Sequence, residues 1–214
     1  MLVRFTAFAL LIAPVCPAVI IDRIAVVVGN AIVKDSDIDR NIRVTAFLNG
    51  EPVDLGPASR KKAASRLIEQ AFIRHEIDIG DYPMVTREEA DQQLKRLEKE
   101  RFGSDAAVQP VLKKDGINRM DVLFEYQWQL TVLQFIDIRF KPAVLISDAD
   151  IEKYYRNHAT ELRRTNPDKT TLDDLRDQIR GILTGEKVND QFFPWLNEQR
   201  KSNKVEFREE SLND

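Results

Sequence analysis

The sequence predicts a mainly α-helical fold with a small antiparallel sheet formed by an N-terminal hairpin and a C-terminal strand. Most of the chain repeats apolar residues at helical spacing, and several helical segments begin with a Ser or Thr followed three positions later by an acidic residue, the spacing of a capping box. Only three short stretches have the β-branched or alternating pattern of strands. With 214 residues, 43% hydrophobic and 31% charged, the chain suits a single domain of ordinary size.

The N-terminus is typical of a secretory signal peptide over residues 1–18. A positive charge precedes the apolar stretch Phe5–Ala13, which is too short to span a bilayer, and Cys16 and Ala18 are the small residues before a cut. We expect cleavage near Val19 and a periplasmic mature chain. An uncut N-terminal anchor and lipid attachment at Cys16 are the alternatives, although a lipid-modified cysteine normally follows a small residue and this one follows Pro-Val.

Composition and motifs exclude most catalytic classes. Cys16 is the only cysteine, so the mature chain has no disulfide, no thiolate metal site and no cysteine nucleophile. The formal net charge of −3 gives no reason to expect nucleic acid as a partner. The sequence contains no Gly-rich phosphate-binding loop, no His-x-x-x-His or Cys pair that could bind zinc, and no Gly-x-Ser-x-Gly motif of a nucleophilic serine. His75 and His158 are isolated on separate predicted helices. We therefore expect no catalytic residue, metal or cofactor, and no enzyme activity.

The first elements are two short strands. Residues 24–28 and 31–33 are rich in β-branched side chains and flank Gly29-Asn30, which favours a type II′ turn because glycine occupies its first central position. A third strand at Val205–Phe207 is expected to pair with this hairpin, because two strands alone are marginal in water. The two ends of the mature chain should therefore meet.

Helices are expected over most of the chain between these strands. The first should begin at the Ser36–Asp39 capping box and end near Leu48, and the second should run from Ala58 or Ser59 to Asp78. Its inward face should carry Ala63, Leu67, Ile68, Ala71, Phe72 and Ile73. The Thr86–Glu89 box begins a charged helix with a narrow apolar stripe. A shorter helix should start at Ser104, with Pro110 causing a kink or an early break.

The helix over 118–140 is the most informative because it has two apolar stripes. One stripe contains Val122, Tyr126, Leu130, Leu133 and Phe140, and the other contains Met120, Phe124, Trp128, Phe135 and Ile138. One stripe is enough to bury a surface helix. Two stripes indicate either a central helix surrounded by protein or a face left open for something apolar.

The C-terminal third should contain two further helices. Ser147 with Asp150 begins a helix over 148–162, and 163–170 reads as a polar linker. Thr171 with Asp174 begins a long helix that Pro194 should bend or divide. We thus expect one domain over 19–210, made of an N-terminal part (19–162), the linker and a closing helix and strand (171–210).

The order of these elements resembles the chaperone domain of SurA-type periplasmic proteins, the SurA N-terminal domain family. The resembling segments are IDRIAVVVGNAIVKDSDIDR, RLIEQAFIRHEI, VTREEADQQL, KKDGIN, VLISDADIEKYYRNH and LRDQIRGILTGEKVNDQFFPWLNEQRKSNKVEF. Members normally carry parvulin-type prolyl isomerase domains before the closing helix, and each needs about 90 to 100 residues. Only 163–170 lies there in this chain. The resemblance therefore implies a SurA-like chaperone without prolyl isomerase activity.

The function implied by this resemblance is ATP-independent binding of unfolded or nascent exported polypeptides, such as outer-membrane protein precursors. Met and aromatic side chains adapt to varied partners. The candidate peptide-binding residues are Met120, Phe124, Trp128 and Phe135, although the same side chains could equally be core. Two alternatives stay open: a dedicated interaction or scaffold module that holds one partner or forms a homodimer, and a prolyl isomerase with an unrecognised site.

Overall fold

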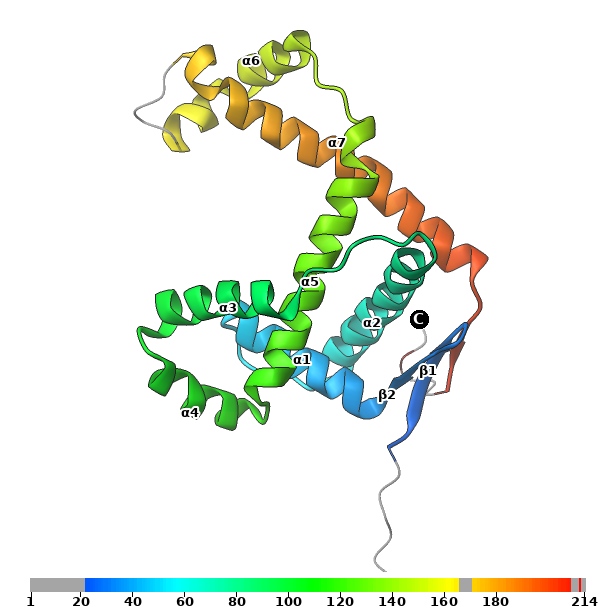
Figure 1. Ribbon diagram of the computed structural model, residues 1–214. Helices are drawn as coiled ribbons and strands as arrows, with labels where there is room; N and C mark the ends of the chain where they lie inside the picture. The colour runs from blue at the N-terminus through cyan, green and yellow to red at the C-terminus, as the bar shows by residue number, and fades with distance from the viewer. Residues whose placement is uncertain (1–21, 166–170, 209–211, 213–214) are drawn as a thin grey trace, which may run out of the picture.

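The predicted mainly helical fold with a small antiparallel sheet is confirmed (Figure 1). The computed structural model describes residues 22–165, 171–208 and 212, so the expected signal peptide at 1–18 lies outside the described residues. The elements are β1 (Ile24–Val28), β2 (Ala31–Lys34), α1 (Asp35–Asn49), α2 (Pro57–Ile79), α3 (Arg87–Phe102), α4 (Asp105–Asp115), α5 (Arg119–Arg139), the 3-10 turn η1 (Lys141–Ala143), α6 (Asp148–Thr165), α7 (Leu172–Ser202) and β3 (Val205–Phe207).

The sheet joins the two ends of the described chain in the order β2-β1-β3. Val28 pairs with Val205 and Val26 with Phe207, so the predicted pairing of the C-terminal strand with the hairpin is confirmed. Gly29 has a φ of 55°, and Asn30 is not among the described residues with positive φ. This combination is the one that a type II′ turn requires.

Capping signals located three helix starts correctly and one incorrectly. The hydroxyls of Thr86, Ser147 and Thr171 each accept a hydrogen bond from the main-chain N–H three residues on. The Ser36–Asp39 box is wrong, because α1 begins earlier, at Asp35. The Ser36 hydroxyl instead donates to Asp22, and the main-chain N–H of Lys34 donates to Asp37 (3.0 Å). Ser36 therefore lies inside α1, and its hydroxyl contacts the segment before β1 in place of capping the helix.

Neither proline divides its helix, so the early break considered at Pro110 and the division considered at Pro194 do not occur. α4 and α7 each continue through their proline. A proline removes the hydrogen bond to the carbonyl four residues earlier. These carbonyls belong to Ala106 and Asp190, which are exposed, so water can replace the lost donor. The expected linker at 163–170 is also shorter than predicted, because α6 continues to Thr165, while 166–170 lie outside the described residues.

Three hydrophobic clusters hold the helices together. The largest lies between the sheet, α1, α2, the second half of α5 and the second half of α7. A second lies between α1, α3, α4 and the first half of α5, and a third lies between α6 and the first half of α7. α5 therefore connects the first two clusters, and α7 connects the first to the third. Of the two alternatives for the 118–140 helix, a central position between two cores accounts for much of its apolar surface.

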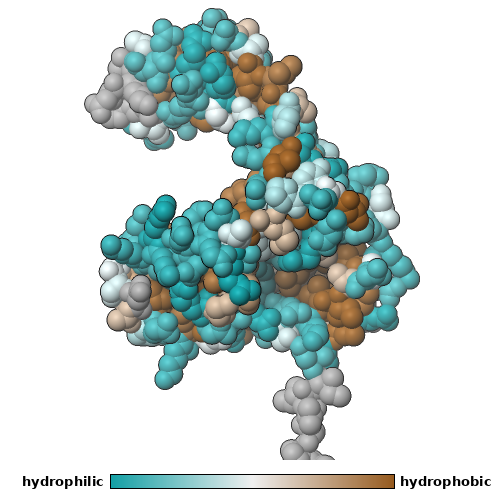
Figure 2. Space-filling model, in the orientation of Figure 1, coloured by the Kyte–Doolittle hydropathy of each residue, from teal (hydrophilic) through white to brown (hydrophobic). Residues whose placement is uncertain are grey.

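α6 and the first half of α7 form an arm that projects from the rest of the molecule (Figure 1). A wide hollow separates the arm from α3 (Figure 2). The surface on both sides of this hollow is largely hydrophilic in the same view. A larger hydrophobic patch lies near the sheet in the same view.

Candidate functional site

The structure separates the four predicted peptide-binding residues into three environments. Phe124 and Trp128 line a pocket on one side of α5. Met120 is 43% exposed and lies outside that lining. Phe135 is wholly buried and packs edge-on against Tyr82 and Phe140. Phe135 therefore lies in the core, which was the alternative left open for these side chains, and the loop before α3 and α7 cover it.

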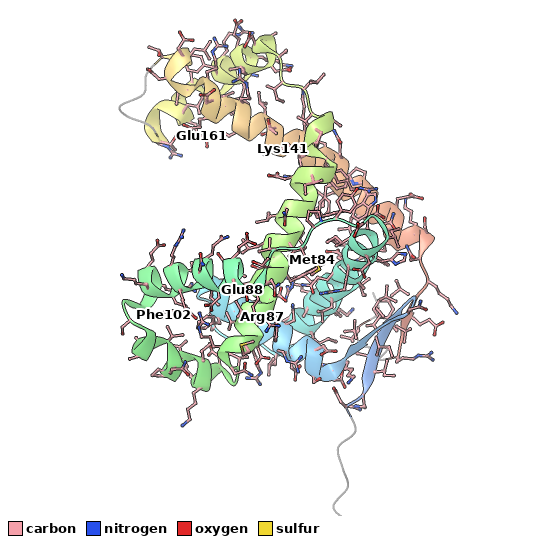
Figure 3. All side chains as sticks on the ribbon, in the orientation of Figure 1. Met84, Arg87, Glu88, Phe102, Lys141 and Glu161 are labelled. Atoms are coloured by element: carbon pink, nitrogen blue, oxygen red, sulfur yellow. The ribbon has the colours of Figure 1, made fainter. Side chains whose placement is uncertain are left out.

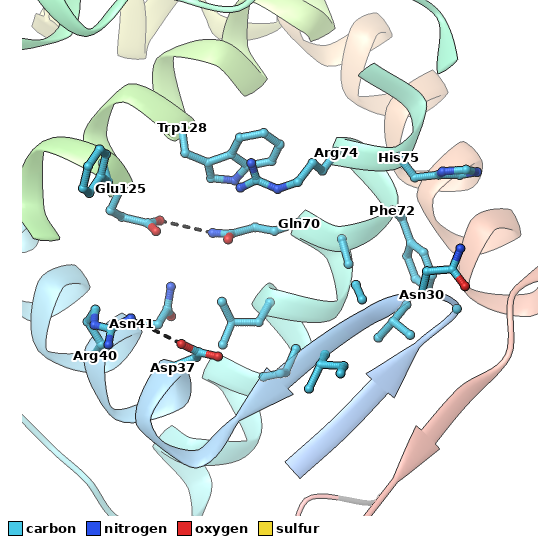
Figure 4. Close-up of a pocket in the computed structure, with 18 of the residues that line it drawn as sticks. Asn30, Asp37, Arg40, Asn41, Gln70, Phe72, Arg74, His75, Glu125 and Trp128 are labelled. Atoms are coloured by element: carbon cyan, nitrogen blue, oxygen red, sulfur yellow. Dashed lines mark hydrogen bonds and ion pairs between the residues drawn. The ribbon is translucent and has the colours of Figure 1, made fainter. Parts of the chain in front are cut away.

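The pocket has a volume of about 720 Å³ and lies between the hairpin, α1, α2 and α5 (Figure 4). Its size suits several residues of a polypeptide or a drug-sized ligand. The apolar part of the lining comes from the hairpin, α2 and α5 and includes Val28, Val33, Leu67, Ala71, Phe72, Phe124 and Trp128. These side chains are placed by elements far apart in the sequence, because the hairpin and α5 both pack against α2.

Arg74 and Trp128 form one wall of the pocket. The Arg74 guanidinium carbon lies 4.2 Å from the centroid of the Trp128 ring, a cation–π contact between α2 and α5. Trp128 is otherwise buried, at 6% exposure, whereas Phe124 is half exposed at 49%. The Arg87 guanidinium at the start of α3 lies over the Phe124 ring at 5.2 Å. The rings of Trp128 and Phe124 are therefore each in contact with an arginine guanidinium, and both side chains line the pocket.

Three polar side chains from α1, α2 and α5 line the pocket: Asn41, Gln70 and Glu125. Oδ1 of Asn41 accepts hydrogen bonds from Nε (3.1 Å) and Nη2 (2.8 Å) of Arg66. Nδ2 of Asn41 is buried without a hydrogen-bond partner among the described residues. Above it, Nε2 of Gln70 donates to Oε1 of Glu125 at 3.2 Å (Figure 4). The pocket thus combines an apolar wall with donors and acceptors held in the interior.

Burial changes the acid–base properties of two of these groups. Burial raises the pKa of the Glu125 carboxyl above its ordinary value of 4.5, although hydrogen bonds from Gln129 and Gln70 act in the opposite direction. Burial also lowers the pKa of the Arg66 guanidinium. The Glu125 carboxyl therefore lies in a desolvated environment, where the side chains of Gln70 and Gln129 donate to it.

The charged rim of the pocket is internally paired on the α1 side. Arg40 contacts Asp37 at 3.3 Å and Asp121 at 3.6 Å, which joins α1 to the start of α5. Arg74 makes no ion pair or hydrogen bond within the described ranges, and its charge is directed at the Trp128 ring. The charged side chains of the rim on the α1 side are therefore already paired with each other, while the apolar lining of the pocket stays open to contact.

The hollow beside the arm has a different chemistry. Figure 3 places Glu161 of α6 and Lys141 on the arm side and Glu88 of α3 on the opposite side. All three residues are exposed and charged. A surface of this kind stays solvated, so the pocket beside the hairpin is the better candidate for binding an apolar segment.

Sequence reasoning did not identify Asn41, Arg66, Gln70 or Glu125. A signal for Asn41 was present, since it lies between Ile38 and Ile42 on the inward face of α1, where a polar side chain needs a partner. Arg66, Gln70 and Glu125 lie on helix faces that look solvated in the sequence. They meet because long side chains from α1, α2 and α5 reach one another: Arg66 donates to Asn41, and Gln70 donates to Glu125.

Two absences concern the described residues alone. No group of His, Cys, Asp or Glu side chains within 22–165, 171–208 and 212 could hold a metal ion. No helix in that part of the chain has the length and apolar character needed to cross a bilayer. Compared with known proteins, the chain matches no family model, and no curated sequence matches it significantly.

Proposed function

We propose that this protein is an exported, ATP-independent chaperone that binds unfolded or extended polypeptides and has no prolyl isomerase activity. The observation that carries the proposal is the pocket beside the hairpin, where Phe124 and Trp128 border an open apolar lining of about 720 Å³. An apolar surface with a polar rim binds unfolded chains weakly, so clients can leave without an energy source. The resemblance to SurA-type proteins and the expected signal peptide support a periplasm as the compartment and outer-membrane protein precursors as clients.

The length of the connection between α6 and α7 supports the exclusion of isomerase activity. α6 ends at Thr165 and α7 begins at Leu172. A parvulin-type domain of about 90 to 100 residues has no room in that connection. A proline-peptide isomerisation assay is expected to show no acceleration, and measurable catalysis would refute this part of the proposal.

The decisive experiment compares two exposed residues of α5. Phe124 and Leu133 are 49% and 62% exposed, but only Phe124 lines the pocket. Purified protein at micromolar concentration should suppress aggregation of an unfolded outer-membrane protein. Phe124→Ser should weaken this suppression, whereas Leu133→Ser should leave it unchanged, with both variants folded by circular dichroism. Equal effects of the two changes, or no suppression across several clients, would refute the proposal.

A second function, a dedicated module for one partner, is favoured by the polar side chains of Asn41, Gln70 and Glu125 that line the pocket. A specific arrangement of buried donors and acceptors can select one ligand. Capture of bound proteins from the periplasm distinguishes the two functions. Many precursor clients support the chaperone, and one stoichiometric partner supports the module.

A further inference from the structure

The outer edge of β2 has no partner strand among the described residues. β2 pairs with β1 on one side only. Val28 and Ala31 close the two-residue turn and are therefore the hydrogen-bonded pair, so the next pair, Val27 and Ile32, is non-hydrogen-bonded. The main-chain N–H and C=O of Ile32 consequently point away from β1. An open strand edge of this kind is a template for an added strand.

This edge borders the pocket. Ala31, Ile32 and Val33 all line it, although the side chains of consecutive strand residues alternate between the two faces of the sheet. Of the residues in β1, only Val28 contributes to the lining. In Figure 4, β2 lies between the pocket and β1. The pocket therefore runs along the edge of β2 and not over one face of the sheet.

We propose that the pocket binds an extended polypeptide segment by its main chain, with the segment added to the outer edge of β2 as a further antiparallel or parallel strand. This inference rests on the proposed chaperone function and names what its binding site recognises. The pocket offers both donors and acceptors: the N–H and C=O of Ile32, Nδ2 of Asn41 and the carboxylate of Glu125. The peptide group offers the same two functions at every residue, so binding of this kind does not depend on client sequence.

Asn41 is the second, independent observation behind the proposal. The residue is 5% exposed, and Nδ2 has no acceptor among the described residues. A buried donor without an acceptor is unfavourable, and such groups are uncommon in folded proteins. In Figure 4 the Asn41 amide lies below the hydrogen bond between Gln70 and Glu125. A client carbonyl reaches this amide when the Gln70 side chain turns aside, which costs one side-chain hydrogen bond.

The charged side chains that line the pocket indicate which kind of polypeptide segment it can bind. The acidic lining residues outnumber the basic ones, namely Asp37, Asp78, Asp121 and Glu125 against Arg40 and Arg74. An acidic segment is therefore repelled, and a neutral or basic segment is accepted. The edge is also short, because the N–H of Lys34 already donates to Asp37. Few main-chain hydrogen bonds form, so the bound segment exchanges readily.

The main test removes the outward N–H of Ile32. The probe is a fluorescein-labelled, end-blocked peptide of alternating Thr and Tyr, and its binding to the full chain is measured by anisotropy. Ile32→Pro deletes an N–H that the hairpin does not use, and proline is tolerated on strand edges. Ile32→Thr is the matched control, because it changes the side chain and keeps the N–H. Ile32→Pro should bind about threefold to tenfold more weakly than Ile32→Thr, as loss of one hydrogen bond predicts.

A second comparison examines the Asn41 amide. Asn41→Asp keeps an acceptor for Arg66 but cannot donate to a client carbonyl. Asn49→Asp makes the same charge change at the exposed end of α1. Asn41→Asp should weaken peptide binding, and Asn49→Asp should not. Equal affinities of these two variants, together with equal affinities of Ile32→Pro and Ile32→Thr, would overturn main-chain recognition.

A peptide test keeps the proposal falsifiable even where Ile32→Pro fails to fold. The same peptide N-methylated at every residue keeps its side chains but lacks main-chain donors, and wild-type protein should not bind it. Replacement of each Thr by Glu should also weaken binding. Equal binding of the methylated and unmethylated peptides would refute recognition of the main chain while leaving the chaperone function intact. Failure of wild-type protein to bind any unfolded client would instead refute the chaperone function itself.

Discussion

The guanidinium of Arg119 holds the buried carboxylate of Glu98, with Nη2 at 3.0 Å and Nε at 3.2 Å from Oε2. The Glu98 side chain is 3% exposed, so it lies inside the contact between α3 and α5. Arg119 is the first residue of α5 and also contacts Asp91 at 2.6 Å. This arrangement anchors the end of α5 that precedes Phe124 and Trp128, so the position of the pocket wall depends on it.

Replacement of Arg119 by Met should therefore destabilise the protein strongly. Removal of one partner of a buried ion pair leaves an uncompensated charge and costs about 3–5 kcal/mol. The free energy of unfolding in urea measures this loss. Arg96→Met, on an exposed position of α3, is the control and should change stability by less than about 0.5 kcal/mol. Similar losses in the two variants would show that the Glu98–Arg119 pair is not buried in solution.

Truncation of two of the predicted binding residues, Phe135 and Met120, should lower the free energy of unfolding by very different amounts. Phe135→Ala removes a wholly buried ring from the aromatic cluster with Phe140 and Trp195, which should cost about 3–5 kcal/mol. Met120→Ala changes a side chain that is 43% exposed and should cost less than about 0.5 kcal/mol. Thermal unfolding of both variants measures the difference. An unchanged Tm of Phe135→Ala would show that the Phe135 ring is not buried in solution and would make it a candidate binding residue again.

Glu125 should make stability depend on pH. Burial raises its pKa in the folded state above the ordinary 4.5, so folding favours the protonated carboxyl. The stability that Glu125 contributes is fully present at pH values below its ordinary pKa of 4.5. It is lost as the pH rises through the raised pKa of the folded state. Glu125→Gln, which cannot ionise, should therefore have a higher Tm than wild type at pH 7, and the difference should shrink as the pH falls through the raised pKa towards 4.5.

Unfolding scans of wild type and Glu125→Gln between pH 4 and pH 8 measure this effect. Glu100→Gln, an exposed change on α3, is the control and should give no such trend. A Tm difference that is constant with pH, or one that grows as the pH falls, would contradict the predicted direction.

The arm should open without unfolding of the sheet. Its core is a separate small cluster built on Ile151, Leu162, Leu175 and Ile179. Ile179→Ala should lower the local stability of the arm by about 2–5 kcal/mol, because the side chain is wholly buried there. Native-state hydrogen exchange should then be faster in α6 and unchanged in β1. Ile42→Ala, in the core beside the sheet, should have the reverse pattern, and coincident changes would show one cooperative unit.

Local signals predicted most of the secondary structure. The caps at Thr86, Ser147 and Thr171 are contacts within four residues, and a type II′ turn needs only a glycine with positive φ. Ser36 failed as a cap for the complementary reason. Its hydrogen-bond partner Asp22 lies outside the helix, so the spacing of residues within the helix could not predict this contact.

The candidate site could be predicted only in part. The residue types at Phe124 and Trp128 indicated an apolar face of α5, and both line the pocket. The same pattern placed Phe135 on that face, yet α7 and the loop before α3 cover it. Asn41 and Glu125 look unremarkable in the sequence, because their burial comes from neighbouring helices.

The sequence by itself determined the helices and the hairpin, because capping, turn geometry and hydrophobic period depend on residues close together in the chain. The pairing of the two ends was predicted on a different ground, since a two-stranded hairpin is marginal in water and Val205–Phe207 is the one further strand pattern. The tertiary structure alone decided which face of α5 stays open, which polar groups become buried in the pocket, and that the edge of β2 borders it. Burial is the physical reason for this division. The environment of a side chain is set by segments that meet in space, and a single helix does not encode which of its apolar faces will be covered.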